Sequence, residues 1–207
     1  MNTIVDVESG EMFAGVPLSE RGPASARVVA AFGFWLFLLS DIIVFSALFA
    51  AYGVLSGQTN GGPSAIELFD KRHVLYETSC LLASSFACGM MMIATDQRDV
   101  PLTYFSALVT AAFGIAFLWL EFSEFAHMVE KGAGPSRSGF LSAFFTLVGT
   151  HGVHVASGLI ALIYLTAQVI AKGLQATTLR RLCWSLFWHA LDIVWVGVFT
   201  LVYLMGD

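Results

Sequence analysis

Apolar runs of about 20 residues or more recur five times along the 207-residue chain. Each run is long enough to cross the hydrocarbon core of a bilayer, which is about 30 Å thick. Charged residues make up only 12% of the sequence and its mean hydropathy is +0.77, whereas about a quarter of a soluble domain is charged. The sequence therefore predicts an all-α membrane protein, a bundle of five transmembrane helices. The expected spans are about 28–55, 74–94, 102–122, 140–171 and 182–205.

The polar connections between these runs predict the domain organisation. Residues 1–27 are expected to form a polar cytoplasmic segment, since they lack the apolar core of a signal peptide. Residues 28–207 are expected to form the five-helix transmembrane domain. The net charge of −5, without any basic stripe, argues against nucleic acid as a partner.

The loop lysines and arginines indicate the orientation, because basic residues gather on the cytoplasmic side. Six of them fall on the side of the N-terminus and four on the other side. We therefore expect a cytoplasmic N-terminus and a periplasmic C-terminus.

Eight ionisable residues lie within or near the expected spans. An ionisable side chain in mid-bilayer costs about 2.5–3.5 kcal/mol on insertion scales, so each one requires an explanation. Three pairs are spaced three residues apart, which places the two members on roughly the same face of a helix. The eight are Asp41, Glu77, Glu121, Glu124, His151, His154, His189 and Asp192.

Two of the chemical explanations find little support in the sequence. A haem or metal site would use His151 and His154, but these lie on one helix, and five histidines in all fall short of the ligand set of a haem-copper catalytic subunit. Intramembrane hydrolysis would need a nucleophile elbow or an HExxH motif, and the sequence has neither.

The residues alone leave two explanations open. In a stand-alone proton-coupled transporter, Asp41 and Glu124 would carry protons. In a helical scaffold, the acids and histidines would pair between helices, where each hydrogen bond contributes about 0.6 kcal/mol and specifies which faces meet. Small-residue stretches such as LASSFACG favour the close helix packing that a scaffold requires.

Five stretches taken together resemble subunit III of the haem-copper terminal oxidases. They are LLSDIIVFSALFAAY, LLASSFACG, WLEFSEF, GFLSAFFTLVGTHGVHVASGLI and FWHALDIVWVGVFTLVYLMG. The resemblance extends from about Val28 to the C-terminus. It is closer to the quinol-oxidising, cytochrome o branch, because subunit III of the cytochrome c oxidases typically has seven spans whereas this chain has room for five.

The resemblance implies a non-catalytic subunit of a proton-pumping ubiquinol oxidase in the aerobic respiratory chain of a bacterial inner membrane. It implies haems and copper in subunit I, partners in subunits I, II and IV, and phospholipid bound between the helices. No catalytic, cofactor-binding or metal-binding residue is expected in this chain. The alternatives are a transporter or subunit III of a cytochrome c oxidase.

The resemblance also suggests roles for the eight ionisable residues. Asp41 occupies the place of a buried carboxylate that reacts with carbodiimide in related oxidases. All eight are expected to be buried polar residues with a structural or lipid-binding role.

Overall fold

The computed structural model describes residues 26–62 and 71–204, which contain helices and no strand. Five of these helices are long and apolar enough to cross a membrane, which confirms the predicted fold class. The elements are α1 (Ala26–Leu55), α3 (Lys71–Asp96), α4 (Val100–Glu130), α5 (Gly139–Lys172), the 3-10 turn η3 (Gln175–Thr177), α6 (Thr178–Val198) and the π-helical turn η4 (Phe199–Leu204). The predicted segment 1–27 lies almost entirely outside the described residues.

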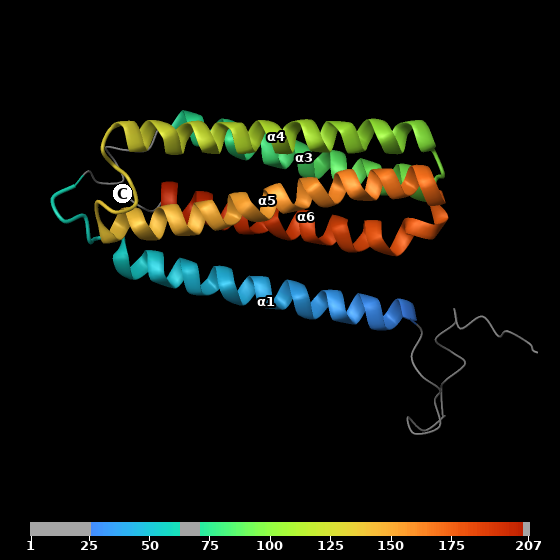
Figure 1. Cartoon of the computed structure of the whole chain (residues 1–207), viewed down its shortest axis with the longest axis horizontal. Helices are drawn as coiled ribbons and strands as arrows, with labels where there is room; N and C mark the ends of the chain where they lie inside the picture. The colour runs from blue at the N-terminus through green and yellow to red at the C-terminus, as the bar shows by residue number, and fades with distance from the viewer. Residues whose placement is uncertain (1–25, 63–70, 205–207) are drawn as a thin grey trace, which may run out of the picture.

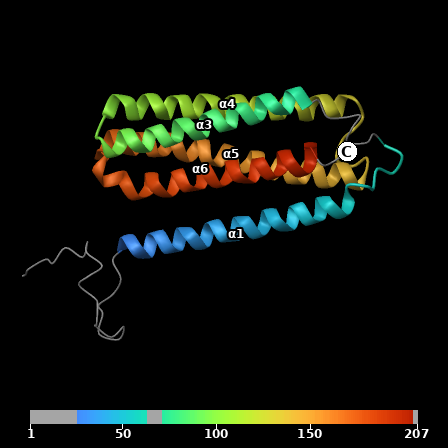
Figure 2. The ribbon, with the colours of Figure 1, turned by 180° about the vertical axis from the view of Figure 1, so that it is seen from behind.

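The helices form an antiparallel bundle in which α3 and α4 make the most extensive pair and α5 and α6 pack against them (Figure 1). The first helix, α1, lies on the outside of the bundle, against α5 and α6 (Figure 2). Because the number of spans is odd, α1 begins at one end of the bundle and η4 finishes at the other.

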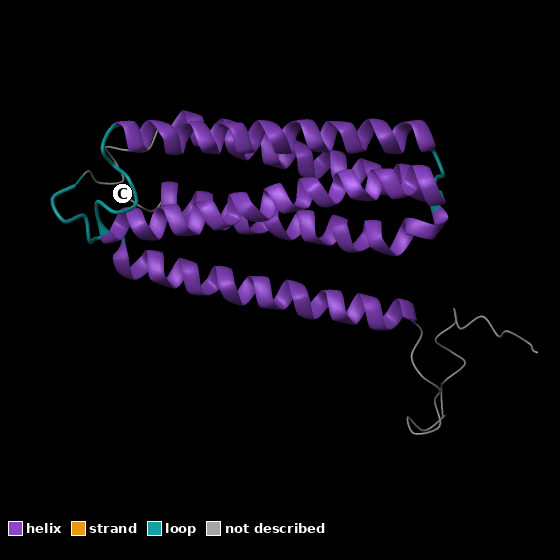
Figure 3. Cartoon of the chain, viewed as in Figure 1, coloured by secondary structure: helices purple, strands orange, loops and turns teal. Residues whose placement is uncertain are grey.

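Local sequence signals fix the ends of the helices, and loops connect them (Figure 3). The Asp99 carboxylate accepts a hydrogen bond from the backbone N–H of Leu102 at the start of α4, and Ser138 caps α5 in the same way through Leu141. Such caps satisfy backbone donors that have no partner within the helix. Gly173 follows α5 with a φ of 80°, a conformation that glycine adopts without steric cost.

The two longest helices, α4 with 31 residues and α5 with 34, exceed the roughly 20 residues that a bilayer requires. The sequence analysis ends the third span near Phe122, whereas α4 continues to Glu130 through the polar stretch that contains Glu124 and His127. Hydropathy marks only the part of a helix that suits hydrocarbon, so it underestimates a helix that projects beyond it. With 34 residues, α5 is about 51 Å long and also exceeds the bilayer core.

The core of the bundle is aromatic and closes around Trp188. This side chain is 1% exposed, stacks on Trp184 with ring centroids 5.3 Å apart, and fits against two glycines. A Cβ atom at Gly114 would lie 3.1 Å from the Trp188 ring, and one at Gly158 would lie 2.9 Å from it. The absence of side chains at these positions allows α4, α5 and α6 to approach each other around one indole.

In contrast to this core, α1 contributes little to the interior. Only 6% of its most apolar stretch is buried, against 33–50% for the other four spans. Phe45, at 1% exposure, and Tyr52, at 4%, are its principal core residues. The helix therefore leaves most of its apolar surface without a neighbour among the described residues.

Candidate functional site: buried polar clusters and two apolar grooves

Three of the predicted acids meet at the end of the bundle where α1 and η4 finish. Glu77 of α3 is fully buried, and Glu121 and Glu124 of α4 are almost so. The three carboxyl groups lie close enough to interact electrostatically. We call these three residues the acidic cluster.

Two neighbouring side chains contact the acidic cluster. The Tyr203 hydroxyl of η4 donates a hydrogen bond of 3.0 Å to Oε2 of Glu124. Nε2 of His73 lies 3.5 Å from Oε1 of Glu77 and 3.2 Å from the carbonyl oxygen of Leu120. The cluster therefore links α3, α4 and the C-terminal turn.

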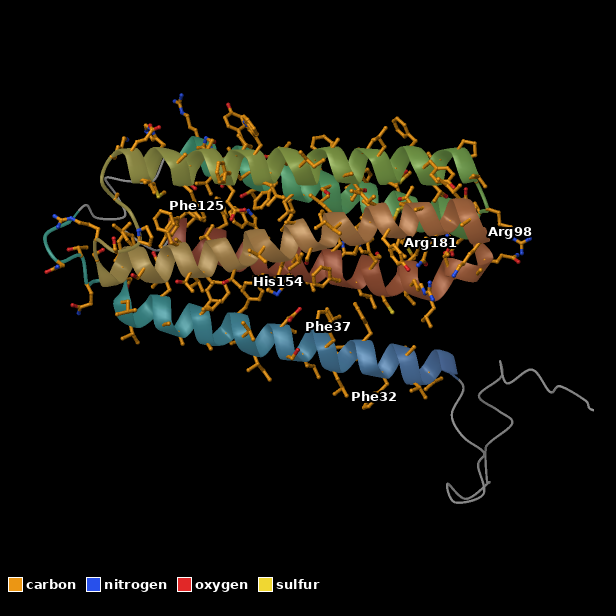
Figure 4. The ribbon with its side chains drawn as sticks, viewed as in Figure 1. Phe32, Phe37, Arg98, Phe125, His154 and Arg181 are labelled. Carbon is orange, nitrogen blue, oxygen red and sulfur yellow. The ribbon has the colours of Figure 1, made fainter. Side chains whose placement is uncertain are left out.

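Asp41, the acid in the first span, faces His154 across the α1–α5 contact. Its Oδ1 lies 3.9 Å from Nε2 of His154, while Nδ1 of that histidine donates to the carbonyl oxygen of Thr150 at 2.7 Å. Because a carbonyl only accepts, Nδ1 carries a proton and Nε2 is the nitrogen available to Asp41. The rings of Phe45 and Phe187 contact His154, whose side chain projects toward α1 in Figure 4.

His151 lies three residues before His154 but contacts a different helix. It is fully buried, and its Nε2 donates a hydrogen bond of 3.2 Å to the carbonyl oxygen of Leu191 on α6. Its ring packs against Phe117 and Trp195, at centroid distances of 5.5 and 5.0 Å. The two histidines thus join α5 to two different neighbours.

His189 and Asp192 of α6 meet one hydroxyl on α3. Oγ of Ser85 lies 2.7 Å from Nδ1 of His189 and is also hydrogen-bonded to the Asp192 carboxyl group. The serine therefore lies between the histidine and the acid. In a hydrolytic triad the histidine takes that middle place, so this arrangement differs from one.

Polar contacts continue along the whole α3–α6 interface, and the sequence analysis did not single out the residues that make them. Nε1 of Trp188 donates to Oγ of Ser84 at 3.1 Å, and Nε1 of Trp195 donates to Oγ1 of Thr78 at 3.1 Å. Ser84 in turn donates to the carbonyl oxygen of Thr110 on α4. The small residues of the stretch LASSFACG predicted close packing at this interface. Its two serine hydroxyl groups were the only feature of that stretch from which these hydrogen bonds could have been predicted.

Arg181 is buried, whereas the sequence analysis assigned it to a loop between the fourth and fifth spans. Its guanidinium group donates to the carbonyl oxygen of Leu174 at 2.6 Å and to Oγ1 of Thr177 at 2.9 Å, and its exposure is 3%. The side chain therefore ties the α5–α6 connection to the start of α6. It lies inside that end of the bundle in Figure 4.

Two apolar grooves open on the outer surface of the bundle. The α1 groove, of about 920 Å³, lies between α1 and the α5–α6 pair. Its lining residues include Phe34, Phe37, Tyr164 and Phe187, and also Arg180. The α4–α5 groove, of about 480 Å³, is lined by apolar residues of both helices and by Glu121. Phe37 marks the first groove and Phe125 the second in Figure 4.

No group of three or more histidine, cysteine, aspartate and glutamate side chains is placed to hold a metal ion within residues 26–62 and 71–204. The ionisable residues instead meet in separate contacts, and each of those contacts joins two or more helices. Such an arrangement can fix the packing of a bundle.

Comparison with known proteins identifies relatives along most of the chain. The family model described as "Cytochrome c oxidase subunit III" matches residues 21–207. "Cytochrome bo(3) ubiquinol oxidase subunit 3" of Pseudomonas aeruginosa is 48% identical over 176 residues, which cover 84% of each chain. "Quinol oxidase subunit 3" of Bacillus subtilis is 41% identical over 84% of this chain and 86% of the relative. These matches confirm the resemblance predicted from the five sequence stretches.

Proposed function

Because the chain belongs to the cytochrome c oxidase subunit III family, we propose that it is subunit III of a proton-pumping ubiquinol oxidase. The complex oxidises ubiquinol, reduces dioxygen to water and contributes to the proton gradient of a bacterial inner membrane. This chain has no redox centre of its own, and the haems and copper reside in subunit I. The identity of 48% to a relative named as a ubiquinol oxidase subunit carries the proposal.

The exposed surface of α1 supports a role within a larger assembly. A single apolar helix that packs on one side only leaves a face that partners or lipids must cover. Subunits I, II and IV of the oxidase are the proposed partners. The charge distribution in the loops supports a cytoplasmic N-terminus and a periplasmic C-terminus.

Phospholipid is the proposed occupant of the α1 groove. Its volume of about 920 Å³ and its aromatic and aliphatic lining suit acyl chains, and Arg180 and Gln175 among its lining residues offer hydrogen-bond donors to a phosphate. Oε1 of Gln168 accepts a hydrogen bond of 2.5 Å from Nη1 of Arg180, which holds the arginine in place.

The eight ionisable residues, of which Glu77, Glu121, Glu124 and His151 are buried and the other four are partly buried, act in this proposal as clamps between helices. Asp41 with His154 joins α1 to α5, and His189 with Asp192 joins α6 to α3. The contact between Glu124 and Tyr203 fastens the C-terminal turn to α4. None of these residues is assigned the transport of pumped protons.

The experiment compares the purified oxidase with and without this chain. A supporting subunit predicts that the complex without it keeps its haem spectrum and its initial rate of ubiquinol oxidation, but loses activity faster during turnover. An initial rate of zero together with an intact haem spectrum would contradict the assigned role, because the chain would then take part in catalysis itself.

A further inference from the structure

A carboxyl group without a hydrogen-bond partner lies at the floor of the α4–α5 groove. Glu121 is 4% exposed, and its Oε2 is buried and has no hydrogen-bond partner among the described residues. A buried polar group left unpaired costs about 1–3 kcal/mol, which a hydrogen bond between the Glu121 carboxyl group and a ligand would recover. Glu121 is also the only ionisable residue among those that line the groove in the described part of the chain.

On the α5 side of the groove, two glycines leave room for the Glu121 carboxyl group and for a ligand. A Cβ atom at Gly152 of α5 would lie 2.5 Å from Oε1 of Glu121, so the carboxyl group rests directly on the helix backbone. Gly149, one turn earlier, lines the groove as well, and a Cβ atom there would reach only Phe125, at 3.8 Å. Any larger residue at position 152 would occupy the place of the carboxyl group.

Aromatic side chains on the α4 side of the groove can pack against a flat ring. Trp119, Phe122 and Phe125 of α4 line the groove, and Phe125 lies between α4 and α5 in Figure 4. The volume of about 480 Å³ falls within the range of small-molecule sites, about 300–1,000 Å³, which are mostly apolar with a few fixed polar groups.

The position and the charge of Glu121 restrict the kind of membrane ligand that the groove can bind. Glu121 lies about 9 Å along the axis from the middle of α4. It comes one residue before the expected end of the apolar span at about Phe122, so it lies at the edge of the hydrocarbon core. A carboxyl group with no lysine or arginine beside it among the described lining residues does not attract the phosphate of a phospholipid. A ligand with an uncharged polar ring and an apolar tail fits this position and this charge.

We infer that the α4–α5 groove binds the head group of a membrane quinol or quinone, with Glu121 as its hydrogen-bond partner and the isoprenoid tail in lipid. The carboxylate accepts a hydrogen bond from a quinol hydroxyl, and the carboxylic acid donates one to a quinone carbonyl, so either redox state is held. The inference rests on the proposed function, which supplies ubiquinol as the substrate of the complex. The groove would hold substrate near the catalytic subunit without reacting with it.

The test uses the whole oxidase complex in lipid nanodiscs, photolabelled with an azido derivative of ubiquinone and analysed by peptide mass spectrometry. The inference predicts adducts within residues 115–125 and 149–156 that excess ubiquinone suppresses and excess phospholipid does not. Suppression by phospholipid, or absence of these adducts from an active complex, would overturn it.

Two surface residues of α5 provide a matched pair of variants. Val153 lines the groove and is 68% exposed, whereas Ile160, two turns along, is 69% exposed and does not line it. Val153→Trp is expected to reduce labelling to background and Ile160→Trp to leave it unchanged. Equal labelling of the two variants would contradict the site; Ala156→Trp replaces Val153→Trp if the latter complex does not assemble.

Variants of Glu121 test the hydrogen bond itself. Glu121→Ala is expected to weaken binding of the azido-ubiquinone about fivefold, the effect of one hydrogen bond, and Glu121→Gln to retain binding because an amide both donates and accepts. Unchanged binding of the azido-ubiquinone in Glu121→Ala would show that the carboxyl group does not bond to the ligand.

Co-purification separates the failure of this inference from failure of the proposed function. A chain that purifies without haem or quinol oxidase activity contradicts the proposed function, and the labelling is then measured on the chain alone. An active complex with an unlabelled groove contradicts only the quinol site.

Discussion

A methyl group added at Gly158 of α5 is predicted to destabilise the bundle, whereas the same change at Gly149 of the same helix is not. At Gly158 the new Cβ atom would lie 2.9 Å from Cζ3 and 3.0 Å from Cε3 of Trp188, and 3.3 Å from the Phe187 ring. At Gly149 its nearest contact is 3.8 Å away, an ordinary van der Waals distance. The two variants therefore differ in packing and not in chemistry.

The size of the destabilisation in Gly158→Ala depends on how firmly the Trp188 side chain is held. Trp188 cannot move away easily, because it is 1% exposed, stacks on Trp184 and donates its Nε1–H to Ser84. Overpacking of a close-packed interior costs about 1–3 kcal/mol. Both variants gain up to about 1 kcal/mol of helix propensity when alanine replaces glycine, so this term cancels in the comparison.

The assay is reversible unfolding of the purified chain in mixed micelles by titration with sodium dodecyl sulfate. We expect the free energy of unfolding of Gly158→Ala to be lower than that of Gly149→Ala by about 1–3 kcal/mol. Equal stability of the two variants would show that the indole does not pack tightly against α5, and the reasoning about the core would be wrong.

Three further predictions concern polar contacts. Trp195→Phe is expected to lower the free energy of unfolding by about 0.6 kcal/mol through loss of the bond to Thr78; Thr78→Val should add nothing to it in a double-mutant cycle, and additive effects would contradict the bond. Asp41→Asn is expected to leave assembly, haem content and the number of protons pumped per electron unchanged; an intact complex that no longer pumps would refute the clamp role. Arg181→Met leaves the Leu174 carbonyl oxygen without its charged donor, so we expect faster proteolysis of the α5–α6 connection, and an unchanged cleavage rate would contradict its role.

The number of membrane spans could be predicted from the sequence because length and hydropathy are local properties. Five apolar runs give five helices, and the cap at Ser138 follows from the polar loop before it. The end of α4 could not be predicted in this way, since the stretch beyond Phe122 is helical but polar. The π-helical turn Phe199–Leu204 is also invisible to hydropathy, which does not distinguish kinds of helix.

The spacing of the ionisable residues predicted shared helix faces but not partners. His151 and His154 are three residues apart, yet one bonds to α6 and the other faces Asp41 on α1. The choice of partner depends on how far each helix is shifted and rotated against its neighbours. In a membrane protein both lipid and helix neighbours are apolar, so the pattern of hydrophobic residues does not encode that rotation.

The buried hydroxyl groups were missed for a related reason. Serine and threonine are common in membrane helices, where they can bond to their own backbone, as Ser79 does to the carbonyl oxygen of Leu75. Ser84 and Ser85 instead bond to side chains of α6. Only the arrangement in space separates these two uses of the same residue type.

The central claim is that this chain belongs to a haem-containing quinol oxidase, and purification in mild detergent through a C-terminal affinity tag tests it most directly. The account predicts that larger subunits co-purify with the tagged chain, with haem absorption bands and ubiquinol-dependent oxygen uptake in the same fraction. A colourless chain recovered alone, stable and in good yield, would contradict it.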